Sequence, residues 1–107
     1  MSGIVSGALQ ASEWKPSGTD GIDYAVLRPQ ESGGHTIFVR MAKGTHGAEH
    51  AHPGGEELYV ISGDVTVGDH RLAAGAYLYT PPGRAHAIDA HADSVLLVSL
   101  PKGAVYG

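Results

Sequence analysis

Short apolar runs separated by turn residues extend along almost the whole chain. The runs are rich in β-branched and aromatic residues, and none shows the 3.6-residue period of an amphipathic helix. In several of them apolar and polar residues alternate, which is typical of strands with one buried face. Seven segments are therefore predicted as β-strands, namely residues 22–28, 35–41, 56–62, 64–68, 76–80, 85–88 and 94–100.

Glycine and proline occupy the junctions between these segments. They supply the positive or fixed φ that tight hairpins need, and they stand at Gly33-Gly34, Gly63, Gly68 and Pro82-Gly83. Many short strands with turns about every 8 to 12 residues predict a sandwich or barrel. A chain of 107 residues has room for one core, so residues 1–107 are expected to form a single domain. Residues 1–12 are either a flexible tail or an edge strand that crosses to a second copy.

Charge and composition narrow the classes of partner. The net charge is −4 and the seven Lys and Arg residues are not clustered, which argues against nucleic acid and membrane partners. The absence of cysteine excludes disulfides, thiolate metal sites and Fe–S clusters. The start of the chain lacks the charged region of a signal peptide, and no run reaches membrane-spanning length. We therefore expect a cytoplasmic protein.

The segment GTHGAEHAHPGGEELYVISG, residues 44–63, concentrates histidine and glutamate beside a tight turn. It is either a solvated, histidine-rich loop or half of a metal site. On a strand, His50 and His52 project to the same face because they are two residues apart. Glu56 follows the turn, so strand parity alone does not place it. A further partner is His86, which follows the rigid turn Pro81-Pro82-Gly83.

Three imidazoles and one carboxylate form a ligand set with definite preferences. Such a set suits Fe, Mn, Ni, Cu or Zn better than Mg or Ca, which prefer shells made only of oxygen. On a six-coordinate ion two positions would stay open for water, substrate or dioxygen. The set is therefore typical of catalysis or of small-ligand binding.

The spacing of these residues resembles the two signature motifs of the cupin superfamily. The first runs from Gly44 through His50, His52 and Glu56 to Gly63, and the second consists of Gly75, Pro81, Gly83 and His86. This resemblance implies an all-β, antiparallel jelly-roll barrel with one internal metal ion, Fe, Zn, Ni or Mn, held by His50, His52, Glu56 and His86. The chain has Ala90 where the second motif often has asparagine, which removes a polar support but no ligand.

Longer stretches are similar to the cupin domain of the ChrR anti-sigma factor and to small stand-alone cupin dioxygenases. These stretches are EWKPSGTDGIDYAVL, TIFVRMAKGTHGAEH and HAHPGGEELYVISGDV. The resemblance implies a non-haem metal dioxygenase that cleaves a small diketone or aryl ketone. The alternatives are a non-catalytic cupin that binds a small ligand or senses an oxidant through its metal, and a Lewis-acid isomerase or lyase.

Residues around the ligand set have competing interpretations. His46 shares the parity of the ligands and is either a base beside the metal or a loop histidine. Tyr79, like Tyr24 and Tyr77, either lines the pocket or packs in the core. Arg40 either pairs with an anionic substrate or occupies an exposed edge.

The remaining candidates are expected outside the site. Glu57 is expected to face away from Glu56, and the other histidines are expected to face solvent: His35, His70 and His91. Open strand edges predict a homodimer, in which the apolar segment from Ile4 to Leu9 crosses to the partner.

Overall fold

The chain folds almost entirely into short strands. A computed structural model describes residues 3–30, 33–102 and 105–106. After a 3₁₀ turn, η1 (Leu9–Ala11), the strands are β1 (Lys15–Pro16), β2 (Ile22–Pro29), β3 (His35–Met41), β4 (His46–Ala51), β5 (Glu56–Ser62), β6 (Asp64–Val67), β7 (His70–Ala73), β8 (Tyr77–Thr80), β9 (Ala85–Ala90), β10 (Ser94–Leu100) and β11 (Val105–Tyr106).

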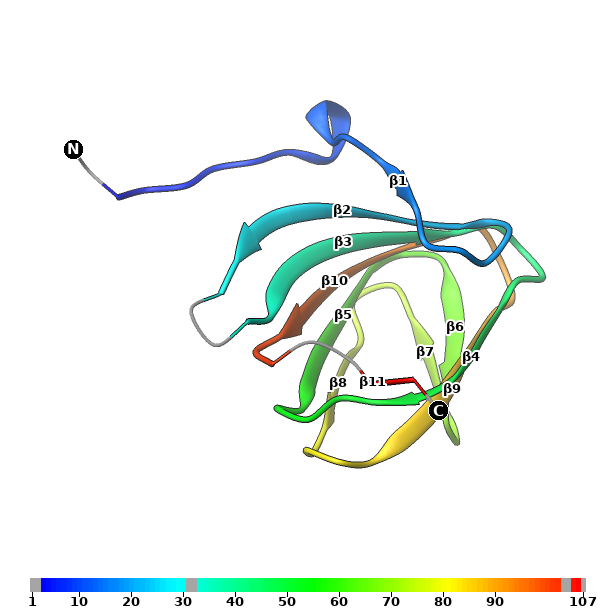
Figure 1. The fold of residues 1–107 in the computed structure, drawn as a ribbon. Helices are drawn as coiled ribbons and strands as arrows, with labels where there is room; N and C mark the ends of the chain where they lie inside the picture. The colour runs from blue at the N-terminus through cyan, green and yellow to red at the C-terminus, as the bar shows by residue number, and fades with distance from the viewer. Residues whose placement is uncertain (1–2, 31–32, 103–104, 107) are drawn as a thin grey trace.

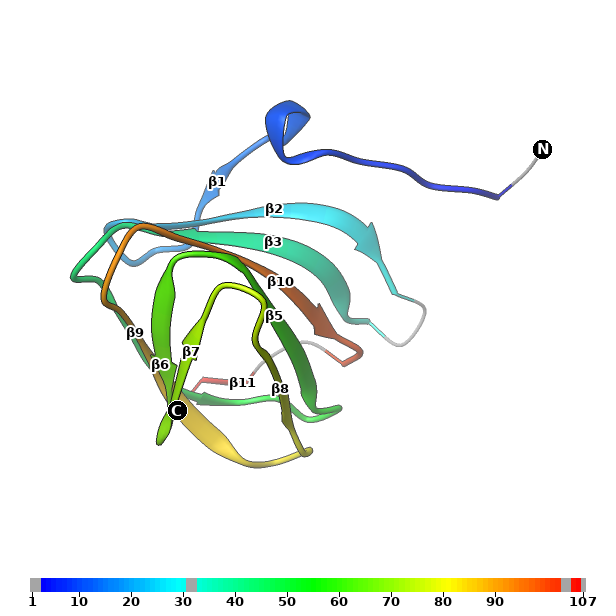
Figure 2. The same ribbon diagram turned by 180° about the vertical axis from the view of Figure 1, so that it is seen from behind.

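Two antiparallel sheets face each other across one interior (Figures 1 and 2). One sheet has the order β1-β2-β3-β10-β5-β8 and the other the order β11-β4-β9-β6-β7. The central strand β10 pairs with β3 on one side and β5 on the other, so segments far apart in sequence lie side by side. The predicted all-β jelly roll is confirmed.

The core follows from the two-residue period of the strands. In β5, Leu58 and Val60 are buried whereas Tyr59 between them is exposed. Val65 and Val67 of β6 supply the facing layer from the other sheet. Alternating apolar residues from the two sheets therefore fill the interior.

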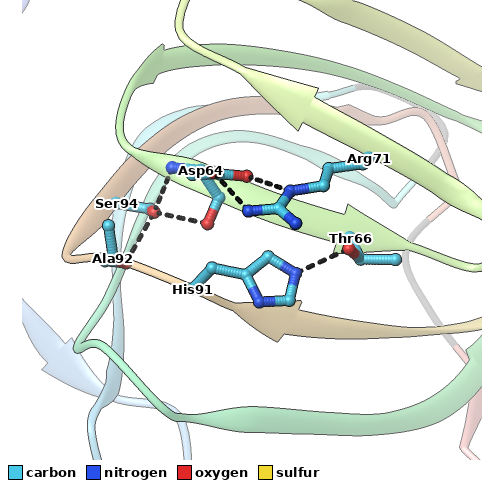
Figure 3. A network of polar contacts seen from close by, with 6 residues as sticks. All are labelled: Asp64, Thr66, Arg71, His91, Ala92 and Ser94. Carbon is cyan, nitrogen blue, oxygen red and sulfur yellow. Dashed lines mark hydrogen bonds and ion pairs between the residues drawn. The ribbon is translucent and has the colours of Figure 1, made fainter.

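A network of polar contacts joins the two sheets where β5 passes into β6 (Figure 3). The hydroxyl of the buried Ser94, at the start of β10, accepts the backbone N–H of Asp64 at 3.1 Å and donates to the carbonyl of Ala92 at 2.8 Å. Arg71 of β7 donates two hydrogen bonds to the Asp64 carboxylate, at 3.1 and 2.9 Å. The backbone N–H and carbonyl of Asp64 therefore both have partners where the chain crosses between the sheets, since the carbonyl accepts the N–H of His91 at 2.8 Å.

All seven predicted strands are present, with ends shifted by at most two residues. The prediction missed four further strands, and β4 is the important one because its sequence, HGAEHA, has no apolar alternation. Its pairing with β9 comes from its neighbours in the fold rather than from its own pattern.

The N-terminal segment lies outside both sheets. From residue 3 to the start of η1 it runs extended beside β2 (Figure 1). Val5 is 61% exposed. Residues 1 and 2, which the prediction of a tail or exchanged strand also included, lie outside the described residues. Within the described part of the chain, no helix is long and apolar enough to cross a membrane.

Candidate metal centre

Strand pairing brings His50 and His86 together. β4 and β9 are antiparallel neighbours, and the Cα atoms of His50 and His86 are direct partners in the ladder. The register of this pair shifts between Gly47 and His50. Gly47 sits tightly against β9, since a Cβ atom there would lie 2.7 Å from the Ile88 side chain. The irregularity turns the end of β4 so that His50 faces the interior.

The turn after His52 places Glu56. The His52 carbonyl accepts the backbone N–H groups of Gly55 at 3.0 Å and of Gly83 at 3.1 Å, which ties the two sequence motifs together. Gly55 has φ of +81°, and a Cβ atom there would lie 3.0 Å from the Thr80 carbonyl oxygen. Only glycine fits this bend without strain. The chain therefore reverses, and Glu56 Oε2 comes to lie 3.0 Å from His52 Nε2.

The four predicted ligands converge. One ligand atom from each lies within 4.8 Å of the others, and we call these residues the His/Glu group: His50, His52, Glu56 and His86. The rings of His50 and His52 are perpendicular, with centroids 4.5 Å apart. His86 Nε2 lies 3.3 Å from Glu56 Oε1. Three of the four side chains are buried, and that of His50 is half-buried.

Burial and mutual contacts shift the charge states of the group. Burial alone would raise the pKa of the Glu56 carboxyl, but the imidazoles of His52 and His86 against it lower that pKa to about 2. Burial, as the largest cause, lowers the pKa of His50 below its ordinary 6.5. Near neutral pH a charged carboxylate and an unprotonated His50 therefore stand together, which are the forms that bind metal.

Contacts behind the rings orient two of the imidazoles. His50 Nδ1 lies 2.8 Å from the Ala48 carbonyl, which can only accept, so this nitrogen carries the proton. His86 Nδ1 lies 3.3 Å from the hydroxyl of Thr80. In each ring the Nε2 atom remains to face the group. Contacts of this kind fix the direction of metal-binding histidines, and the carbonyl contact also fixes the tautomer of His50.

The donor set fits a divalent transition metal. Glu56 Oε1 is fully buried, and no donor within the described residues is aligned to hydrogen-bond with it although His86 Nε2 is 3.3 Å away. Three imidazoles around one carboxylate match the preferences of Fe, Mn, Ni or Zn. An ion among them would satisfy the buried oxygen.

The His/Glu group lines a cavity of about 530 Å³ inside the barrel. Aliphatic side chains make most of the wall, including Val39, Leu96 and Val98 of the larger sheet and Ile88 of the smaller one. The size is that of a small-molecule site. The arrangement can therefore hold an organic ligand beside a bound ion.

The structure leaves His46 and Tyr79 outside this cavity. His46 is largely exposed, and its Nδ1 lies 2.6 Å from Asp89 Oδ1. Because the register of the β4–β9 ladder shifts between Gly47 and His50, His46 and His50 do not project to the same face. Tyr79 is 53% exposed because β8 turns Leu78 and Thr80 inward instead. Neither residue is among those that line the cavity.

The other candidates divide between the cavity and the surface. Tyr24 lines the cavity, whereas Tyr77 is exposed and donates a hydrogen bond to Glu57 at 2.8 Å. Arg40 pairs with Asp23 at 2.9 Å, outside the cavity. The three histidines expected to face solvent are exposed: His35, His70 and His91.

Sequence reasoning did not single out Thr80, which supports His86. Its signal was available in the segment YLYT, where strand alternation turns the two tyrosines outward and buries the hydroxyl residue. A buried threonine within the second motif, just before Pro81, is a polar group that needs a partner.

Comparisons with known proteins agree with this fold. The family model described as the ChrR cupin-like domain matches residues 4–105. A search of curated proteins finds no match.

Solved structures with the same fold include three informative relatives. Acetylacetone dioxygenase from Acinetobacter johnsonii is 20% identical with a TM-score of 0.77, over 91% of this chain and 72% of that chain. A chain of the Rhodobacter sphaeroides complex of SigE with the anti-sigma ChrR is 22% identical with a TM-score of 0.76, over 87% of this chain and 50% of that chain. KdgF from Halomonas sp. is 20% identical with a TM-score of 0.72, over 88% and 92%. Identities this low show the shared fold alone.

Proposed function

Because this chain belongs to the ChrR cupin-like domain family, we propose that its His/Glu group binds one divalent transition-metal ion. The proposal rests on the convergence of three imidazoles and a carboxylate within 4.8 Å at a buried position. Hydrogen bonds behind His50 and His86 support it, since they aim the Nε2 atoms inward.

We further propose that the metal-loaded protein is a dioxygenase that cleaves a small diketone or aryl ketone. When bound, an ion such as Fe(II) would supply the open coordination positions and the redox chemistry. The aliphatic wall would hold the hydrocarbon part of the substrate and exclude bulk water. In the overall reaction one C–C bond breaks and each new end receives one atom of dioxygen, so no separate reductant is needed. The fold shared with acetylacetone dioxygenase supports this version.

Elemental analysis tests the metal site first. The protein purified without added metal should contain about one equivalent of metal, and His50→Ala should lose it. His70→Ala is the matched control because it removes an exposed imidazole at the start of β7 that does not line the cavity, and it should keep the metal. Equal metal content in the two variants would show that His50 is not a metal ligand.

Oxygen uptake then tests the reaction. The iron-loaded protein should consume about one dioxygen per cleaved acetylacetone or hydroxyacetophenone, and Glu56→Gln should reduce that rate strongly. If the iron-loaded protein binds such ketones but consumes no oxygen with any of them, the dioxygenase proposal fails.

A second candidate is a sensing or binding module, which the family match and the ChrR-containing structure favour. In this version the metal holds a ligand without turnover. A rise in the unfolding temperature with a ligand, without product, would support it over the enzyme. The Lewis-acid alternative has less support, because its proposed base His46 lies outside the cavity.

We also propose a homodimer. The outer face of the larger sheet carries an apolar row in which Phe38, Leu97, Tyr59 and Tyr77 are successive cross-strand partners. Tyr59 and Tyr77 are 43% and 57% exposed, and tyrosine is enriched at protein interfaces. Sedimentation should give twice the chain mass, and the double variant Tyr59→Glu, Tyr77→Glu should give monomers. A monomeric mass for the unaltered protein would reject the dimer.

A further inference from the structure

The cavity wall is larger and more apolar than a small polar ligand needs. Its volume of about 530 Å³ equals the liquid volume of roughly 18 water molecules. Aliphatic side chains project into it from β3 and β10, among them Ile37, Met41, Leu96 and Val98. A compact polar molecule on the His/Glu group would leave this wall without apolar contacts. The wall therefore favours a ligand with an extended hydrocarbon part.

The same wall offers no cationic side chain. Among the residues that line the cavity in the described chain, the charged or metal-binding ones all belong to the His/Glu group. The nearest candidate from the sequence, Arg40, pairs with Asp23 and stacks on Trp14 outside the cavity. An anionic group away from the ion would therefore have no cationic partner, and the only polar side chains near it would be the hydroxyls of Ser17, Thr19 and Tyr24 among the described residues of the lining, so its burial is costly.

The net charge of the metal-loaded His/Glu group determines which ligand charge the site favours. A divalent ion contributes two positive charges, the Glu56 carboxylate removes one, and three neutral imidazoles change nothing. The buried site then carries one positive charge, which a singly charged anion neutralises. A dianion would leave an unpaired negative charge inside the barrel.

We infer that the cavity takes an amphiphilic ligand, whose oxygen-bearing head binds the ion as a monoanionic chelate and whose acyl chain or aromatic body fills the aliphatic wall. Dianionic chelators are rejected. This inference deepens the proposed function and rests on it for the ion. It narrows the ligand to enolisable or hydroxyl-bearing carbonyl compounds with a substantial apolar part.

Two matched pairs of probes test the inference on zinc-loaded protein, which is redox-inert. Octanohydroxamic acid and acetohydroxamic acid share a monoanionic head and differ by six methylene groups. Since each fully buried methylene strengthens binding about fourfold, calorimetry should give the longer probe at least about a hundredfold higher affinity. Acetylacetone and malonate share the same oxygen-to-oxygen frame, and acetylacetone should bind whereas malonate should not.

A wall variant supplies the reciprocal test. Ile37→Lys places a cation inside the cavity and should weaken octanohydroxamic acid while allowing malonate to bind. Ala73→Lys adds the same charge at an exposed position of β7, outside the cavity, and should leave both affinities unchanged. Circular dichroism and zinc content check that each variant folds. The probe pairs on the unaltered protein decide the question if Ile37→Lys does not fold.

The outcomes separate this inference from the proposed function. Equal affinities for the two hydroxamic acids, or malonate binding as tightly as acetylacetone, would overturn the inference while the metal site stands. If the protein binds no ion, the proposed function fails first. In that case thermal unfolding of the metal-free protein still tests whether the aliphatic wall binds a hydrocarbon chain. Octanohydroxamic acid should raise the midpoint temperature of unfolding more than acetohydroxamic acid does. Equal midpoints would overturn the inference as well.

Discussion

At the scale of single residues, the Glu56 carboxyl gives a pH-dependent stability in metal-free protein. Its pKa falls from an ordinary 4.5 to about 2, so its contribution is complete above 4.5 and is lost as the pH falls through 2. The difference in unfolding free energy between the chelator-treated protein and its Glu56→Gln variant should therefore shrink as the pH falls from about 4.5 toward 2. Urea unfolding followed by circular dichroism measures this difference at each pH. A difference that stayed constant down to pH 2 would contradict the lowered pKa.

Residues of the candidate site differ in how far the sequence could predict them. His50 and His52 were proposed together from the parity they would have on a strand, although His52 lies just beyond β4, and His86 was proposed from the turn before it and from motif spacing. Glu56 needed the resemblance, because the bend at Gly55 interrupts the parity rule. His46 shows the limit of that rule, since the register shift between Gly47 and His50 reverses the facing of side chains without any mark in the hydrophobic pattern.

At the scale of elements, the crossing from β5 to β6 depends on Gly63. Its φ is +99°, and a Cβ atom there would lie 2.6 Å from the Asp93 carbonyl oxygen and also against Ser94. Gly75 has a similar φ of +91° with open space around it. Gly75→Ala should therefore lower the free energy of unfolding by about 1–2 kcal/mol because of its φ alone. Gly63→Ala should lower it by at least about 1 kcal/mol more. Urea unfolding of both variants gives the comparison. Equal losses would show that the crowding at this crossing relaxes freely.

Strands with a periodic pattern were predictable as elements, and those without one were not. β3, β5 and β10 match their predicted ranges because apolar residues recur along their inward faces. β4 is mostly glycine, histidine and other small or polar residues, so its ladders with β9 and β11, and not its sequence pattern, reveal it as a strand. Because it has few apolar residues, β4 contributes the candidate ligand His50 rather than core side chains.

At the scale of the whole molecule, the His/Glu group spans both sheets. Glu56 begins β5 of the larger sheet, whereas His50 and His86 lie on β4 and β9 of the smaller one. A bound ion would therefore join the two sheets in the folded state only, and its binding free energy would add to stability. At a free ion concentration of a hundred times Kd the gain is about 2.7 kcal/mol. Removing the metal with a chelator should lower the thermal midpoint of the protein and of His70→Ala by the same amount, and should leave that of His50→Ala unchanged. Calorimetry measures all three, and an equal drop in His50→Ala would mean that the stabilising ion sits elsewhere.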